Sequence, residues 1–303
     1  MTPPQIAAAS EVMRTTGWAD YALLDSGGGR KLEQYGPYKV VRPEPQCLWT
    51  PRLAQSAWDA ADAVFDPSDE EDAGRWRFRD KPKETWPLGW GDVKFHGRFT
   101  AFRHLAFFPE QAANWAWLDA KVRAAVSSEN GGQPRVLNLF GYTGVASLVM
   151  AAAGAAVTHV DASKKAVAWA RENAELSGLS DRPVRWIVED AKKYVQREVR
   201  RGSKYDGIIL DPPKYGRGPD GQVWRLFEDL PELSGLCAEL LSENAKFLVL
   251  NAYAERISGA ALAGLLAEKL AGRGGRIEWG ELALEEQRGD RAIGMSFFAR
   301  WSA

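Results

Sequence analysis

The run Asp211-Pro212-Pro213-Lys214-Tyr215 holds the residue types best suited to chemistry. Two adjacent prolines fix the backbone and remove two N–H donors, so carbonyl oxygens and a carboxylate are left to accept hydrogen bonds from an amine. The ring of Tyr215 can stack on a flat acceptor. We therefore assign catalytic roles to Asp211, Pro212 and Tyr215, and we expect Lys214 to contact the substrate, although it could equally point into water. A rigid turn without chemistry is the alternative.

A glycine-containing run, Phe140-Gly141-Tyr142-Thr143-Gly144, precedes these residues in the chain. Two glycines three positions apart allow a tight turn and a close approach of the backbone to a ligand. The full pattern G-x-G-x-x-G is absent, which argues against a pyrophosphate cofactor and a nicotinamide dehydrogenase. Taken alone, the run could also be a purely structural turn between a strand and a helix.

Two carboxylates lie between these runs. Asp161 stands twenty positions beyond Gly141, where an acidic residue can bind the two hydroxyls of an adenosine ribose. Farther along, a carboxylate of the pair Glu189-Asp190 can accept a hydrogen bond from an adenine amino group. The alternatives are an aspartate near the positive end of the following helix and, for Asp190 with Glu189, an ordinary exposed acidic pair.

The elements that must position these residues alternate between strands and helices. Seven runs have strand character: Arg135–Phe140, Ala156–Asp161, Val184–Val188, Tyr205–Leu210, Phe247–Leu250, Arg276–Leu284 and Ile293–Trp301. Helical patterns separate the first six: Val145–Ala153, a helix starting after the N-cap Ser163 and stopping at Gly178, Ala191–Arg201, Trp224–Leu241 and Ala260–Ala271.

This alternation predicts an α/β fold with a Rossmann-like, doubly wound, mostly parallel sheet of seven strands. The last two strands have no helix between them, so we expect the C-terminal strand to be antiparallel. Ligands of such sheets bind beyond the carboxyl ends of the strands. The glycine run, Asp161, Asp190 and the Asp-Pro-Pro run all follow strands directly, so one edge of the sheet is the predicted site.

The first hundred residues read differently. Short strand-like runs are separated by Gly, Pro and Asp clusters: Tyr21–Asp25, Tyr38–Arg42, Arg75–Arg79 and Val93–Phe102. Such spacing predicts a smaller β-rich domain. We place it at residues 1–110, as a substrate-recognition domain, and the α/β domain at residues 111–303, opening with a helix at Trp115–Ala125.

Cations fall on alternate positions in the β-rich part: Arg75, Arg77, Arg79, Lys81 and Lys83, interleaved with Trp76 and Phe78. On a strand the cations would share one face and the rings the other. That face could bind a nucleic-acid backbone, or it could be a solvated strand face. We assign substrate binding to Arg75, Arg77 and Arg79.

The segments VLNLFGYTG, VTHVDASKKAV, VEDA and DPPKYGRGP together resemble the class I S-adenosylmethionine-dependent methyltransferases. Among these, the pattern is most similar to the bacterial 23S ribosomal RNA methyltransferases of the cytosine-C5 and guanine-N2 kind, from about Phe107 to Trp301. The resemblance implies S-adenosylmethionine as the cofactor and RNA, ribosomal RNA above all, as the partner.

The resemblance also implies the cofactor contacts. Asp161, with Ala162 and Ser163, would hold the ribose; Asp190, with Ala191, would hold the adenine. The methionine part would meet the run from Phe140 to Gly144. The remaining implied contacts are Asp211, Asn138, which stands where an acidic residue is common in the class, and Gln111, whose segment folds over the cofactor in the family.

Cytosine-C5 chemistry requires a thiolate that adds to the base. The fifth predicted strand continues as Leu250-Asn251-Ala252-Tyr253 without a cysteine. Cys237 lies among apolar residues of a predicted helix, and Cys47 belongs to the β-rich part. We therefore expect direct transfer to a base nitrogen, with the acceptor aligned in line and flipped out of any duplex.

Composition limits the alternatives. The 303 residues carry a net charge of −1, two cysteines and three histidines, which argues against a protein that coats nucleic acid, a disulfide framework or a metal site. The start lacks the pattern of a signal peptide, and glycines interrupt the uncharged stretch Val136–Val160, so we expect a cytoplasmic protein that does not contact a membrane. A protein or small-molecule acceptor, or a non-catalytic module that binds the cofactor or RNA, remain the alternatives. The oligomeric state is not predictable.

Overall fold

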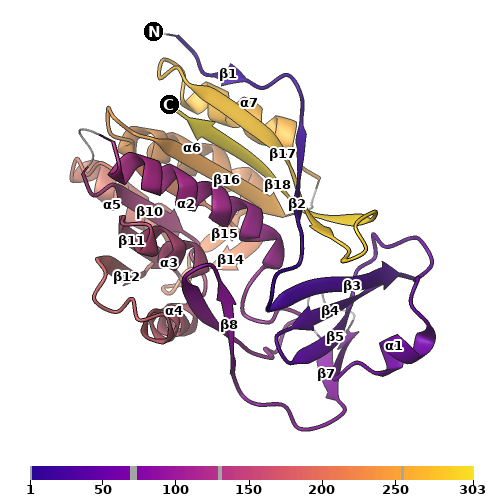
Figure 1. Cartoon of the computed structure of the whole chain (residues 1–303). Helices are drawn as coiled ribbons and strands as arrows, with labels where there is room; N and C mark the ends of the chain where they lie inside the picture. The colour runs from indigo at the N-terminus through magenta and orange to yellow at the C-terminus, as the bar shows by residue number, and fades with distance from the viewer. Residues whose placement is uncertain (1, 69–73, 129–131, 254–255) are drawn as a thin grey trace. The chain divides into compact units, whose positions relative to one another are not determined.

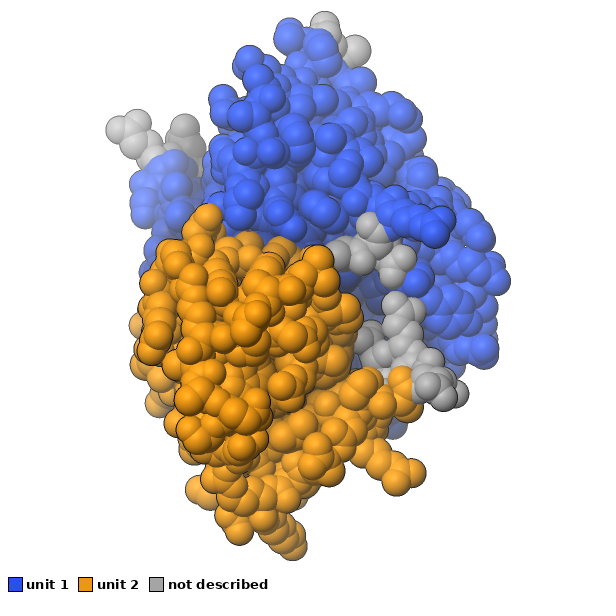
Figure 2. Space-filling view, turned by 90° about the vertical axis from the view of Figure 1, so that its right-hand side faces the viewer, with its two compact units in different colours: residues 1–13, 114–282, 295–303 blue, residues 14–113, 283–294 orange. Residues whose placement is uncertain are grey.

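The computed structural model of the chain describes residues 2–68, 74–128, 132–253 and 256–303. The chain forms two compact units, shown in Figure 2. Unit 1 comprises residues 1–13, 114–282 and 295–303, and unit 2 comprises residues 14–113 and 283–294. The division into a domain of residues 1–110 and a domain of residues 111–303 stays a prediction.

Unit 1 is built on one sheet. Its strands are β1 (Gln5–Ile6), β2 (Glu11–Thr15), β10 (Arg135–Leu139), β11 (Ala156–Asp161), β12 (Val184–Val188), β13 (Gly207–Leu210), β16 (Phe247–Tyr253), β17 (Arg276–Glu285) and β18 (Ala292–Ser302). They are ordered β1-β17-β18-β16-β13-β10-β11-β12, and β2 also pairs with β17. The neighbours β12, β11, β10, β13 and β16 all pair in parallel, and β18 runs antiparallel to β16.

The predicted fold class is thereby confirmed: the seven expected strands form a mostly parallel sheet with an antiparallel C-terminal strand. The short strands β1 and β2 were not predicted from the sequence. They add to the sheet at β17, where β1 pairs in parallel.

Helices cover both faces of this sheet (Figure 1). They are α2 (Ala112–Val126), α3 (Val145–Ala152), α4 (Lys164–Leu176), α5 (Ala191–Arg200), α6 (Leu226–Leu240) and α7 (Gly259–Lys269). Successive side chains of a strand point to opposite faces. In β10, Val136 therefore packs in an apolar cluster with α2 and α3, whereas Leu137 and Leu139 pack with α5, α6 and α7.

The sequence placed a helix start at Trp224, and this boundary is wrong. The chain instead forms a hairpin of β14 (Tyr215–Arg217) and β15 (Val223–Arg225), and α6 begins at Leu226. Val223 and Trp224 are of strand-favouring types, and Trp224 pairs with Gly216 across the hairpin. The backbone N–H of Leu226 then donates to the carbonyl of Lys214 at 3.0 Å, which closes the hairpin at its base.

Unit 2 is β-rich, as predicted. Its elements are β3 (Tyr21–Gly27), β4 (Arg30–Tyr35), β5 (Tyr38–Pro43), α1 (Gln55–Asp59), β6 (Ala63–Pro67), β7 (Gly74–Phe78), β8 (Trp86–Trp90), β9 (Val93–Gly97) and the short 3-10 helix η1 (Pro109–Gln111). The first five strands form one sheet in chain order, and β8 pairs with β9. None of the helices among the described residues is long and apolar enough to cross a membrane.

Candidate active site

Adjacent strands of unit 1 bring the predicted site together at one edge of the sheet. β12, β11, β10 and β13 are consecutive neighbours and run parallel, so their carboxyl ends meet at the same edge. The residues that follow these ends are Asp190 after β12, Asp161 at the end of β11, the loop of residues 140–144 after β10, and Asp211 after β13. The structure therefore brings these groups to one edge of the sheet, as the sequence predicted.

The loop after β10 has an unusual backbone. Phe140 and Tyr142 have positive φ angles of 58° and 49°, and Gly144 has a φ of 82°. Left-handed conformations of residues with a side chain are costly and are kept where the surrounding structure enforces them. Two backbone hydrogen bonds hold the loop: Gly141 N–H donates to the carbonyl of Val160 at 3.1 Å, and Gly144 N–H donates to that of Gly141 at 2.9 Å.

Asp161 fixes the same loop through its side chain. Its Oδ2 accepts from the backbone N–H of Tyr142 and its Oδ1 from that of Ser163, both at 2.8 Å. Burial raises the pKa of this carboxyl, and the two N–H groups oppose the rise. Each carboxylate oxygen can accept a second hydrogen bond. Asp161 can therefore bind two ribose hydroxyls while it holds the loop, a second role that the sequence did not reveal.

A buried polar chain lies behind the loop. Asn138 Nδ2 donates to Ser147 Oγ at 2.9 Å, and Ser147 Oγ lies 3.0 Å from His159 Nδ1. Asn138 is 2% exposed and His159 is fully buried, and burial lowers the pKa of His159 to about 3, so the ring is neutral. The structure thus places Asn138 against α3 beneath the loop, and its predicted contact with the cofactor stays a prediction.

The structure adds a reason for glycine at position 141 that the sequence did not reveal. A Cβ there would come within 2.4 Å of His159 Cε1 and 2.5 Å of His159 Nδ1, closer than real Cβ contacts come. Gly141 is therefore required by the ring packed against it, besides any ligand. Gly144 is required for two reasons. Its φ angle is positive, and a Cβ added at this position would lie 2.8 Å from the Cβ of Ala170.

Asp190 begins α5. Its Oδ1 accepts from the backbone N–H of Lys193 at 2.9 Å and caps the helix. The neighbouring Glu189 is instead paired with Arg197 at 3.1 Å. Because this N-cap bond uses Oδ1, Asp190 Oδ2 is the oxygen that can accept from an adenine amine, and Ala191 beside it is buried.

Trp224 joins the loop after β10 to the run after β13. Its Nε1 donates to the carbonyl of Pro213 at 2.7 Å, and its ring centroid lies 5.0 Å from that of Phe140. Trp224 is 4% exposed and Pro212 is buried, whereas Tyr215 is 50% exposed. Sequence reasoning missed Trp224, because it was expected in a helix; a tryptophan shortly after an Asp-Pro-Pro run was the available signal.

Four predicted site residues lie in unit 2: Gln111, Arg75, Arg77 and Arg79. Gln111 ends the short helix η1 and is 6% exposed. Arg77 forms an ion pair with Asp66, and Arg79 donates from Nη2 to the carbonyl of Asp59 at 2.8 Å. Arg75 is exposed on β7. The structure therefore brings the glycine loop, Asp161, Asp190 and Asp211 together in unit 1, and their roles and those of the unit 2 residues stay predictions.

The strand β7 is shorter than the cation pattern suggested. It ends at Phe78, so Arg79, Lys81 and Lys83 lie beyond it. The rings do share a face: Trp76 and Phe78 lie 4.9 Å and 4.8 Å from the ring of Phe99.

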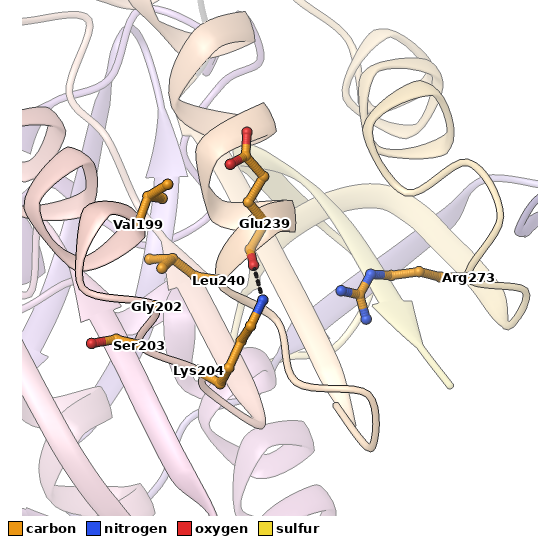
Figure 3. Close-up of a pocket in the computed structure, with 7 residues that line it drawn as sticks. All are labelled: Val199, Gly202, Ser203, Lys204, Glu239, Leu240 and Arg273. Carbon is orange, nitrogen blue, oxygen red and sulfur yellow. Dashed lines mark hydrogen bonds between the residues drawn. The ribbon is translucent and has the colours of Figure 1, made fainter.

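A hollow of about 350 Å³ lies at the opposite edge of the sheet in unit 1 (Figure 3). In it Lys204 Nζ donates to the carbonyl of Glu239 at 2.7 Å, and Arg273 donates to the carbonyls of Ala238, Leu241 and Ser242. Cations at the last carbonyls of a helix stabilise its C-terminus. The cations that line the hollow therefore serve to cap the C-terminal end of α6. Among the described residues no group of histidine, cysteine and carboxylate side chains could hold a metal ion.

The fold and the site define a doubly wound α/β protein with a ligand site at the carboxyl edge of its sheet. Comparison with known proteins identifies its family. Residues 71–244 match the model of the S-adenosylmethionine-dependent methyltransferase family, and the chain belongs to that family. The protein is thus a methyltransferase enzyme with S-adenosylmethionine as its cofactor.

Individual relatives agree with this family. The crystal structure of the SAM-dependent methyltransferase from Agrobacterium tumefaciens is 50% identical with a TM-score of 0.94, over 99% of this chain and 96% of that chain. The ribosomal RNA large subunit methyltransferase K/L of Shewanella frigidimarina is 33% identical over 45% of this chain and 19% of its own length. The ribosomal RNA large subunit methyltransferase I of Aeromonas salmonicida is 38% identical over 33% of this chain and 25% of its own. The chain spans a quarter or less of these two curated relatives.

The residues at the edge fit this cofactor. Asp161 and Asp190 are carboxylates that each keep acceptor capacity after their bonds to backbone N–H groups. The loop after β10, next to Asp161, presents a backbone that the protein holds in an uncommon conformation. Acceptors for hydroxyl and amino hydrogens, spaced over neighbouring strands, are what a nucleoside requires.

Proposed function

We propose that the protein transfers a methyl group from S-adenosylmethionine to a base nitrogen of RNA, with ribosomal RNA as the acceptor best supported. The curated relatives named for large-subunit ribosomal RNA support the kind of acceptor. The observation that carries the reaction type is the run from Asp211 to Tyr215, which follows β13 next to the glycine loop and ends in a half-exposed ring.

The state of both cysteines supports a reaction without a covalent enzyme intermediate. Cys237 in α6 is fully buried, and burial raises the pKa of its thiol. Cys47 is fully buried in unit 2, and burial together with Glu44 raises its pKa to about 11. A nucleophilic cysteine has to be accessible and deprotonated near neutral pH. Neither thiol meets this requirement.

S-adenosylmethionine, when bound, supplies a methyl group already activated by the sulfonium. In this proposal Asp161, with Ala162 and Ser163, holds the ribose, Asp190 with Ala191 holds the adenine, and the loop after β10 holds the methionine part. Asp211 and the carbonyl of Pro212 orient the acceptor amine, and Tyr215 stacks on its base. The chain then has only to align the acceptor and exclude water.

The remaining predicted roles complete the proposal. Residues 1–110 act as a domain that helps to select the substrate, through Arg75, Arg77 and Arg79, and Gln111 adds a cofactor contact. Lys214 contacts a phosphate of the acceptor strand. An acceptor in ribosomal RNA would place the enzyme in the cytoplasm.

The test is transfer of radiolabelled methyl groups to ribosomal RNA from a strain that lacks the gene, followed by mass spectrometry of its nucleosides. We expect one N-methylated nucleoside to be missing in the deletion strain and restored by the wild type but not by Asp211→Ala. Label found only in protein or in small molecules would overturn the RNA acceptor, and a C5-methylated pyrimidine would overturn the reaction type.

A further inference from the structure

The β14–β15 hairpin has two unlike faces. Side chains alternate along a strand, and Trp224 lies on the inner face, where it contacts Pro213 and Phe140. The outer face is formed by four exposed residues: Tyr215, Arg217, Val223 and Arg225. They are paired across the strands, Tyr215 with Arg225 and Arg217 with Val223. Opposite residues of an antiparallel pair lie about 5 Å apart at Cβ, so the four side chains form one continuous surface.

The chain holds this hairpin in place from both ends. At the base, Trp224 Nε1 donates to the carbonyl of Pro213, and Arg225 N–H donates to Asp229 Oδ2 at 2.9 Å. At the tip, Asp220 forms an ion pair of 2.8 Å with Lys193 of α5. A surface that is already ordered loses less conformational entropy when it binds a partner. The hairpin is therefore suited to binding and not only to connecting two elements.

The chemistry of the outer face favours a polyanion with exposed rings. The face carries two guanidinium groups and no carboxylate. Arg225 is paired with Glu228 at 3.3 Å, whereas Arg217 has no ion pair or side-chain hydrogen bond within the described part of the chain. Tyr215 is 50% exposed, Val223 is 41% exposed, and Phe227 in the first turn of α6 is 57% exposed. Cations interleaved with exposed rings bind the phosphates and the base faces of unpaired nucleic acid.

We infer that the outer face of the β14–β15 hairpin, together with Phe227, binds the unpaired RNA strand that flanks the acceptor nucleotide. The inference rests on the proposed function and adds to it the substrate class, single-stranded RNA. Tyr215 is both the last residue of the catalytic run and the first of β14, so the acceptor position continues directly into this face. A duplex hides the faces of its bases, so it cannot use the exposed rings.

Binding of a short fluorescein-labelled RNA, single-stranded or annealed to its complement, tests this inference by anisotropy at several salt concentrations. Arg217→Gln should reduce the slope of log affinity against log salt by about 0.7, the value for one phosphate contact on a single strand. Phe227→Ala should weaken affinity about fivefold or more through lost stacking and leave the slope unchanged. The matched control is Arg200→Gln, an exposed arginine at the far end of α5, which should behave as the wild type.

Calorimetry with S-adenosylmethionine should show unchanged cofactor affinity in all three variants. If the wild type methylates RNA but Arg217→Gln and Phe227→Ala bind RNA as Arg200→Gln does, the hairpin is not the binding face and the proposed function stands. If the duplex binds as tightly as the single strand, the substrate class is wrong. If the wild type methylates only protein, the proposed function and this inference both fail.

Discussion

At the scale of single residues, Asp161 holds the loop at which we expect the cofactor to bind. Its two oxygens accept one backbone N–H each, from Tyr142 and Ser163. The first bond holds a residue with positive φ, so the carboxylate helps to stabilise the strained loop. A ligand hydroxyl would occupy the acceptor position that remains on each oxygen.

We expect Asp161→Ala to raise the Kd for S-adenosylmethionine at least tenfold, because each hydrogen bond to a charged group is worth about 1.5–3 kcal/mol. Burial raises the pKa of the Asp161 carboxyl. As the pH is lowered, this carboxyl should therefore become protonated, and the affinity for S-adenosylmethionine should fall, at a higher pH than for an ordinary aspartate. Titration calorimetry measures both. Asp181→Asn, an exposed acid in the turn before β12, is the control. Unchanged affinity in Asp161→Ala would remove Asp161 from the site.

Tyr215 is expected to act through its ring. Tyr215→Ala should lower kcat for RNA at least tenfold and leave the affinity for S-adenosylmethionine unchanged, because its partner is the acceptor base. Tyr215→Phe keeps the ring and should retain most of the activity. Single-turnover assays at saturating cofactor measure the effect. Equal losses in the two variants would mean that the hydroxyl, and not stacking, matters.

At the scale of elements, the glycine loop and β11 form one structural pair. Gly141 lies against the ring of His159 on β11, and Asp161 at the end of the same strand binds the loop. The loop therefore takes its shape from the neighbouring strand as much as from its own sequence.

This pairing can be tested with a double-mutant cycle. Gly141→Ala places a Cβ about where the His159 ring lies, and we expect it to lower the free energy of unfolding by about 1–3 kcal/mol, the usual cost of overpacking. His159→Ala removes the ring, so in the double variant the Gly141→Ala cost should shrink. Urea denaturation measures each step. Additive effects would contradict direct packing of the two residues.

The seven expected strands of the sheet could be predicted because strands and helices alternate regularly along this part of the chain. Runs such as Gly207–Leu210 and Phe247–Tyr253 are apolar since both faces of the sheet are covered. The strands β1 and β2 could not be predicted, because they are short and mostly exposed. They also depend on pairing with β17, which is distant in the chain.

In the site, the residues at the strand ends were predictable from position alone. The second role of Asp161 was not, because it depends on the left-handed conformation of Tyr142. The contact from Trp224 to Pro213 spans eleven positions, beyond the reach of a local pattern. Such links follow from tertiary packing and are seen only in the folded chain.

At the scale of the whole molecule, the burial of both thiols favours the proposed transfer without a covalent intermediate. A double variant, Cys47→Ala with Cys237→Ala, should methylate at close to the wild-type rate, because neither thiol is exposed. RNA containing 5-fluorocytosine should form no stable adduct with the unmodified protein, which gives a readout that does not depend on the variant folding. A covalent adduct that is lost on substitution of one cysteine would return the protein to cytosine-C5 chemistry.

Two histidines, the buried His159 of unit 1 and the half-buried His104 of unit 2, should make the fold sensitive to acid. Burial lowers the pKa of His159 and of His104 to about 3, with Arg42 adding to the effect at His104. In the unfolded chain both histidines become protonated below about pH 6.5, whereas in the folded chain they stay neutral until about pH 3. The free energy of unfolding therefore keeps its full value above about pH 6.5. It falls as the pH is lowered toward 3, by up to about 1.4 kcal/mol per pH unit for each histidine.

Chemical denaturation at pH 7 and pH 5 measures this loss. His159→Gln should be less sensitive to acid than the wild type, because the glutamine does not titrate. An equal loss of stability in both proteins would contradict the depressed pKa.

The two units draw on both ends of the sequence, and this sets the order in which a growing chain can fold. Unit 1 begins with residues 1–13 and is closed by residues 295–303, and unit 2 includes residues 283–294. β18 inserts between β16 and β17. Unit 2 is complete only after residues 283–294 have left the ribosome, and unit 1 only after β18 has followed. Until then β16 is an edge strand with unpaired backbone groups, and such edges can pair with another chain, so we expect nascent chains to aggregate most readily just before β18 emerges.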